Sequence, residues 1–181
     1  MGSQTNTLVY WLTIITILME RENVMPNTTT IRKDVKITGS VYNDFKDIRE
    51  FYRKHETTLI DAFDECKKIF KVDDVRLLIR NIRKRSTVGS YNNGLKQINL
   101  DLRRFNIKSI VSTIIHEMTH AKQYKDGRLK DKTNAKATFE NVEYSCPKNM
   151  SHKKYLDLPW EIEARKMQDK YIDQVMKAIK K

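Results

Sequence analysis

Cysteine, proline and glycine are all scarce in this 181-residue chain, which holds 2 Cys, 3 Pro and 5 Gly. Cys66 and Cys146 are far apart, so the sequence has neither a disulfide framework nor a C-x-x-C zinc motif. The low proline and glycine content excludes collagen-like and low-complexity chains. Because 39% of the residues are hydrophobic, enough apolar side chains remain for a core. We therefore expect one helix-rich globular domain from a reducing compartment.

A long hydrophobic run is missing as well. The apolar stretch at residues 8–19 is shorter than the roughly 18–20 residues that a membrane-spanning helix needs. No Lys or Arg precedes it and no small-residue cleavage site follows, so a secretory signal is not indicated. We expect a cytoplasmic protein that is not secreted. Residues 1–40 are expected to form a weakly structured or β-rich leader or, alternatively, an apolar membrane-associated anchor, unless translation starts at Met25, and residues 41–181 to form the domain.

Negative charge is in the minority, because 35 Lys and Arg residues outnumber 23 Asp and Glu residues and give a net charge of +12. Such an excess suits association with nucleic acid, anionic surfaces or acidic substrates, but it defines no chemistry. Five cations without an intervening acidic residue lie at Arg76, Arg80, Arg83, Lys84 and Arg85. They predict a phosphate-binding face or, alternatively, a solvated strand edge whose charges block edge-to-edge pairing.

Apolar spacing predicts a helix followed by a small sheet in the first part of the domain. Residues 41–70 carry apolar side chains at intervals of three and four, which predicts one long helix or two helices broken near Thr57. Residues 75–82 are aliphatic and β-branched enough for a strand. The Asn93-Gly94 pair downstream is a strong hairpin signal. We therefore expect a sheet of about three strands.

The most periodic segment is residues 107–124. Its apolar side chains recur along one face, with Asn106 available as N-cap. The opposite face carries His116, Glu117 and His120 in an H-E-x-x-H motif. At about 100° per residue the two histidines lie within about 40° of each other, so both imidazoles can reach one tetrahedral Zn²⁺. Glu117 then projects beside the metal, where a general base must stand.

A third zinc ligand must come from elsewhere in the chain. Residues 125–157 show no sustained period, which is typical of a functional or disordered connection. Pro159 then opens a last helix that carries Glu161 and Glu163. We prefer Glu161, since Ala164 follows at i+3 and is small enough for close packing against the H-E-x-x-H helix. Either carboxylate would also stabilise a helix start without binding metal.

Together these motifs resemble the zincin metallopeptidases of the gluzincin type. The H-E-x-x-H motif followed by Glu161-x-x-Ala164 is similar to small SprT-like or ImmA-like metallopeptidases of bacteria and their phages, over about residues 90–165. The resemblance implies a peptidase in which zinc activates water and Glu117 passes the water's proton to the leaving amine. It also implies an α+β, zincin-like fold. In that fold an antiparallel or mixed sheet packs on the H-E-x-x-H helix, with long helices at both ends of the domain.

Two further expectations accompany this resemblance. An oxyanion donor is needed, and Tyr155, Tyr144 and His152 are candidates. We favour Tyr155 because it lies six positions before Glu161. The hairpin strand through Lys96–Asn99 is expected to be the sheet edge along which an extended peptide lies.

Other functions remain open at this stage. The chain can be a basic nucleic-acid-associated protein with a structural or vestigial metal site, and the five clustered cations favour this alternative. A protease that acts on DNA-bound proteins combines both hypotheses. A protease devoted to one repressor-like partner and a zinc enzyme acting on a non-peptide amide are further alternatives. For a peptidase, the basic excess favours acidic or DNA-bound protein substrates.

Overall fold

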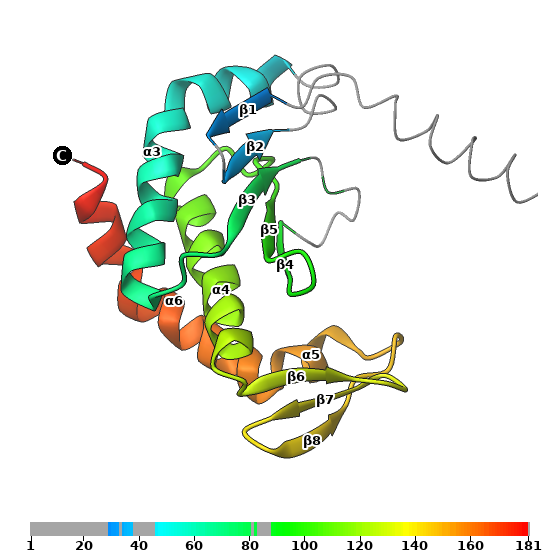
Figure 1. The fold of residues 1–181 in the computed structure, drawn as a ribbon. Helices are drawn as coiled ribbons and strands as arrows, with labels where there is room; N and C mark the ends of the chain where they lie inside the picture. Colours follow the sequence, from blue (N-terminus) through cyan, green and yellow to red (C-terminus); the bar gives the residue numbers. More distant parts are fainter. Residues whose placement is uncertain (1–28, 33, 38–45, 81, 83–87, 181) are drawn as a thin grey trace, which may run out of the picture.

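The computed structural model describes residues 29–32, 34–37, 46–80, 82 and 88–180, which form an α+β protein (Figure 1). The apolar stretch at residues 8–19 and Met25 lie outside this part of the chain, as do Arg83, Lys84 and Arg85. Among the described helices, none is long and apolar enough to cross a membrane.

The described residues form four helices and eight strands. The helices are α3 (Lys46–Phe70), α4 (Ile107–Lys125), α5 (His152–Leu156) and α6 (Pro159–Ala178). The strands of the first sheet are β1 (Thr29–Arg32), β2 (Val35–Ile37), β3 (Arg76–Ile79), β4 (Gly89–Asn92) and β5 (Gln97–Leu100). The strands of the second sheet are β6 (Leu129–Lys132), β7 (Lys136–Phe139) and β8 (Val142–Ser145).

The first sheet is mixed and has the strand order β1-β2-β3-β5-β4. Its three inner strands are parallel to each other, whereas β1 and β4 run antiparallel to their neighbours. The prediction of about three strands is therefore wrong. Strands β1 and β2 fall within residues 1–40, so the sheet extends across the predicted domain boundary at residue 41. Strands of three or four residues show too little alternation to be recognised in a sequence.

The hairpin predicted from Asn93-Gly94 is confirmed as β4 and β5. Residues 93–96 close it, with Lys96 in the left-handed region at φ 49°. Strand β5 pairs with β3 on one side and with β4 on the other, so the substrate edge predicted at Lys96–Asn99 is wrong. Within the described residues the edge strands are β1 and β4 (Gly89–Asn92). Strand β5 is internal because β3, which comes from outside the hairpin, pairs with it.

Helices α3 and α4 pack against one face of this sheet. The buried side chains of β3 and β5 alternate with more exposed ones and join the helices in a single core. The predicted apolar stripe of α4 is buried here, and Val111, Ile115 and Met118 have no exposed surface. Helix α3 continues through Thr57 without the break that the sequence allowed. The side chain of Asn106 caps α4 as predicted, accepting a hydrogen bond from the Ser109 backbone N–H at 2.9 Å.

Helix α6 lies antiparallel along α4. Lys108 near the start of α4 pairs with Asp173 near the end of α6, whereas His120 near the end of α4 contacts Glu161 in the first turn of α6. Pro159 opens α6 as predicted. Ala164 is fully buried, consistent with the close packing expected there.

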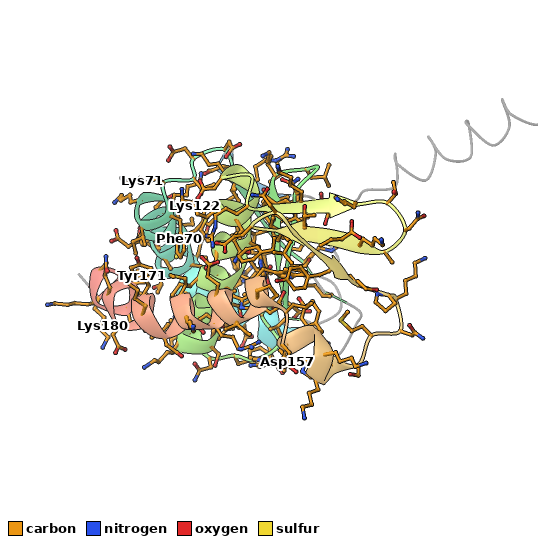
Figure 2. All side chains as sticks on the ribbon, turned by 90° about the horizontal axis from the view of Figure 1, so that it is seen from below. Phe70, Lys71, Lys122, Asp157, Tyr171 and Lys180 are labelled. Atoms are coloured by element: carbon orange, nitrogen blue, oxygen red, sulfur yellow. The ribbon has the colours of Figure 1, made fainter. Side chains whose placement is uncertain are left out.

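Helix α6 also reaches the end of α3. Figure 2 shows α6 crossing the molecule between Asp157 and Lys180, with Tyr171 close to Phe70. The two rings meet edge to face, with their centroids 5.5 Å apart. This contact joins the last helix to the main core.

The second sheet lies apart from the first, where α4 ends and α6 begins (Figure 1). It is antiparallel, in the order β6-β7-β8. Residues 125–157, interpreted from the sequence as a functional or disordered connection, are ordered and contain three strands and α5. The sheet buries few apolar residues, which explains its weak sequence pattern. Leu129, Ala137 and Phe139 of the sheet form a small cluster with Leu158 and Trp160 at the start of α6.

Candidate metal centre

Three side chains from two helices converge at the end of α4. His116 and His120 extend from successive turns of α4, and Glu161 reaches them from the first turn of α6. The two Nε2 atoms lie 3.1 Å apart. The Glu161 carboxylate places Oε2 3.2 Å from Nε2 of His116 and Oε1 3.3 Å from Nε2 of His120. We refer to these three residues as the His-His-Glu centre.

These separations suit a small tetrahedral cation. Ligands at bond lengths of about 2.0–2.1 Å around tetrahedral Zn²⁺ lie roughly 3.3–3.4 Å apart. The distances of 3.1, 3.2 and 3.3 Å within the His-His-Glu centre are close to that value. Two imidazoles and one carboxylate are also a donor set that catalytic zinc sites use, with a fourth position left for water or substrate. The residues of the centre therefore fit Zn²⁺.

A glutamine orients each histidine from behind. Nδ1 of His116 lies 3.1 Å from Oε1 of Gln168, and Nδ1 of His120 lies 2.9 Å from Oε1 of Gln123. The Nε2 group of Gln168 donates to the backbone carbonyl of Ser112, and that of Gln123 donates to the backbone carbonyl of Trp160. Since the amide nitrogens face acceptors, both amide oxygens must face the histidines, and each Nδ1 carries the proton. Both Nε2 lone pairs are then free to bind a metal.

Glu161 is ionised in this environment. It is only 2% exposed, and burial alone would raise its pKa. Hydrogen bonds with His116 and His120 outweigh burial, and the net pKa of Glu161 lies well below its ordinary value. For His120, burial is the largest influence and lowers the pKa, but the hydrogen bond with Glu161, the negative charges of Glu117 and Glu161 and the hydrogen bond with Gln123 together raise it. Without a metal, the carboxylate of Glu161 is therefore stabilised by the two imidazoles beside it.

Glu117 lies beside the centre, and its pKa is shifted in the opposite direction to that of Glu161. It is 7% exposed, and burial raises its pKa more than the nearby histidines lower it. The backbone N–H of Tyr91 on β4 donates to its carboxylate. A buried carboxyl group with a raised pKa is suited to exchange protons near neutral pH.

The edge strand of the first sheet passes directly over Glu117. A Cβ atom added at Gly89 would clash with the side chain of Thr113 and would lie 3.0 Å from Oε1 of Glu117. Only glycine allows β4 to approach α4 this closely. The approach places the free edge of the sheet next to the acidic side chain and within reach of the His-His-Glu centre.

Glu163, the alternative third ligand, lies elsewhere. Its carboxylate accepts two hydrogen bonds from Arg128, at 2.8 Å each, and one from Gln123 at 3.2 Å. Glu161 rather than Glu163 therefore joins the two histidines in the structure. Residues two positions apart on a helix point about 200° apart, so Glu161 and Glu163 cannot both reach the two histidines.

The three candidate oxyanion donors occupy different surroundings. The hydroxyl group of Tyr155 forms a hydrogen bond with Glu161, and its side chain is partly exposed at the end of α5. Burial and the negative charge of Glu161 raise the pKa of Tyr155. Tyr144 instead packs edge-on against Trp160, with ring centroids 5.5 Å apart. His152 is exposed at the start of α5. The structure thus brings Tyr155 to the centre.

The predicted basic face is described only in part. The Arg76 guanidinium donates to the carbonyl of Leu95 at 2.9 Å, and Arg80 is exposed. The remaining three cations of that group lie outside the described residues. Between α4 and β7 many positive charges are neutralised locally, as in the pairs Lys122–Asp126, Lys132–Glu143 and Lys136–Glu143.

Sequence reasoning missed several residues that shape the centre. Gln123 follows His120 at i+3 on α4, and Gln168 follows Glu161 two turns along α6, so helical spacing places both on the ligand-bearing faces. That spacing was a usable signal. Gly89 gave none, because its role depends on how β4 crosses α4.

Comparisons of the chain with protein-family models, with curated proteins and with solved structures found no significant match.

Proposed function

We propose that this protein is a zinc-dependent metallopeptidase with a zincin-like active site, in which His116, His120 and Glu161 hold the metal. The His-His-Glu centre carries this proposal, because the two Nε2 atoms lie 3.1 Å apart, each lies 3.2–3.3 Å from a different oxygen of the Glu161 carboxylate, and both imidazoles are held in the metal-binding tautomer. Glu117 at the same site supports a hydrolytic function over a purely structural metal site, since a structural site has no use for a buried proton acceptor.

The residues divide the proposed reaction between them. When bound, Zn²⁺ supplies a Lewis acid that polarises the scissile carbonyl and lowers the pKa of water. Glu117 takes a proton from the attacking water and delivers it to the leaving amine, a role that its raised pKa favours. Tyr155 is the proposed donor to the oxyanion, because its hydroxyl group already lies beside Glu161.

Strand β4 is the proposed support for the substrate backbone. It is the free edge of the first sheet next to α4, and Gly89 and Tyr91 on this strand contact or approach Glu117. An extended peptide added antiparallel or parallel to this edge would form backbone hydrogen bonds that do not depend on its sequence. A peptide or protein is thus the proposed substrate class.

The test is metal content and peptide hydrolysis of the full chain. We expect about one zinc per chain by elemental analysis after dialysis, together with zinc-dependent cleavage of a mixture of unrelated peptides followed by mass spectrometry. His116→Ala should lose both, because one of three ligands is gone. His55→Ala is the matched control, since this histidine lies on α3 and is not one of the three residues of the cluster.

The outcomes separate the proposal from its alternatives. Zinc bound at one per chain without cleavage of any peptide would favour a structural metal site. A wild-type protein that binds neither zinc nor another divalent metal would overturn the proposal.

A further inference from the structure

The two histidines of the centre are supported in different ways. Behind His116, Gln168 donates to the backbone carbonyl of Ser112 and to its hydroxyl group, at 3.1 and 2.8 Å, so this support is neutral. Behind His120, Gln123 donates to the carboxylate of Glu163 at 3.2 Å as well as to a backbone carbonyl. Only the second support includes charged groups.

Glu163 is itself held by a forked ion pair. Arg128 donates from Nη1 to Oε1 and from Nη2 to Oε2, both at 2.8 Å. Arg128 lies between α4 and β6, and its backbone N–H donates to the carbonyl of Gln123 at 3.0 Å. The guanidinium group lies over the ring of Phe139 on β7, 5.0 Å from its centroid. Two planar contacts and a backbone hydrogen bond fix Arg128 in one orientation.

A continuous chain of contacts therefore runs from the second sheet to the centre. It passes from Arg128 to Glu163, from Glu163 to Gln123 and from Gln123 to His120. Gln123 has no exposed surface, so no bulk water competes for its amide. In such surroundings an anion that accepts from the amide nitrogen polarises the amide and makes its oxygen a stronger acceptor.

We propose that Arg128 and Glu163 are positioning residues for the metal centre. They hold Gln123 so that its oxygen fixes the Nδ1–H tautomer of His120 and increases the basicity of its Nε2 atom. The inference rests on the proposed function, because it assumes that His120 binds the metal. It assigns a role to the second sheet, which delivers Arg128 and thereby stabilises one ligand of the centre.

Glu140 provides a matched control for Glu163. Both carboxylates pair with the Arg128 guanidinium, and Glu140 accepts from Nε at 3.1 Å and from Nη2 at 2.6 Å. Glu140 is in the exposed turn between β7 and β8, and among the described residues it has no contact with Gln123. The substitutions Glu163→Gln and Glu140→Gln therefore remove the same charge from the same arginine, but only the first interrupts the chain to His120.

The experiment measures zinc affinity of the full-length variants by competition with a chelator, and the visible spectrum after loading with Co²⁺. We expect Glu163→Gln to weaken zinc binding about tenfold and to shift the Co²⁺ absorption bands. Glu140→Gln should match the wild type in both. Arg128→Lys should lie between them, because a lysine retains the charge but not the forked geometry.

Equal zinc affinity and equal Co²⁺ spectra for wild type, Glu163→Gln and Arg128→Lys would overturn this inference and leave the peptidase proposal standing. A wild-type chain that binds neither metal would overturn both. If circular dichroism shows that Glu163→Gln does not fold, Arg128→Lys decides the outcome by the same two measurements.

Discussion

Two buried carboxyl groups lie at the centre, Glu117 on α4 and Glu161 on α6, and their pKa values shift in opposite directions. On the α4 side, burial dominates and raises the pKa of Glu117. On the α6 side, Glu161 is at least as buried, but direct hydrogen bonds with His116 and His120 lower its pKa. Burial alone therefore does not set the protonation of a site carboxylate. The direct hydrogen-bond partners of the carboxyl group decide whether its pKa is raised or lowered.

The largest expected effect comes from replacing each carboxylate by its amide. Glu117→Gln should retain about one zinc per chain but lose peptidase activity by about 10²–10⁴-fold, because a general base is removed while the ligands stay. Glu161→Gln should instead lose zinc, because an uncharged amide is a poor zinc ligand. Elemental analysis and peptide cleavage on the same preparations measure both effects. Loss of zinc in both variants would contradict the different roles expected for Glu117 and Glu161.

An intermediate effect is expected from disturbing the close packing of β4 against Glu117. Gly89→Ala should destabilise the fold by about 1–3 kcal/mol, since the added methyl group collides with the side chains of Thr113 and Glu117. It should also reduce activity more than zinc binding. Gly94→Ala in the same hairpin is the control, because its added Cβ would meet only Asn92 Oδ1 at 3.6 Å. Chemical denaturation of both variants checks the prediction, which fails if they unfold at the same midpoint.

The smallest effect is a difference between Glu161→Gln and Glu117→Gln in how the free energy of unfolding of the metal-free protein depends on pH. A lowered folded pKa means that Glu161 contributes stability above its ordinary pKa of 4.5 and loses it as the pH falls. A raised folded pKa means that the contribution of Glu117 is present below 4.5 and is lost as the pH rises. From pH 4 to 7, the destabilisation by Glu161→Gln should therefore grow.

Over the same range Glu117→Gln should become more stable relative to the wild type. Urea unfolding at several pH values measures both slopes, and slopes of equal sign would contradict the opposite electrostatics of the two sides.

Features that depend on neighbouring residues were predictable from the sequence. The apolar stripe of α4, its cap at Asn106 and the common face of His116 and His120 follow from helical periodicity, which needs no distant contact. The hairpin at Asn93-Gly94 was predictable for the same reason, since its signal lies in adjacent residues. The position of β5 inside the sheet was not, because β3 pairs with it from outside the hairpin.

The second sheet shows the limit of periodicity most clearly. Its strands have four residues each, and seven of these twelve side chains are exposed, five of them charged. Only the contact with Trp160 and Leu158 gives Leu129, Ala137 and Phe139 a core to join. An apolar pattern of three residues cannot be told apart from chance until the partner surface is known.

The sequence by itself determined which chemistry the chain can offer: two histidines one turn apart on a helix, with a glutamate between them. The tertiary structure decided which carboxylate meets those histidines, which amides orient them and which strand borders them. Helical spacing within one segment is local geometry, whereas the choice of Glu161 over Glu163 depends on how α6 rotates against α4. In that orientation Ala164 is buried and Glu163 pairs with Arg128, and both depend on packing against other segments of the chain.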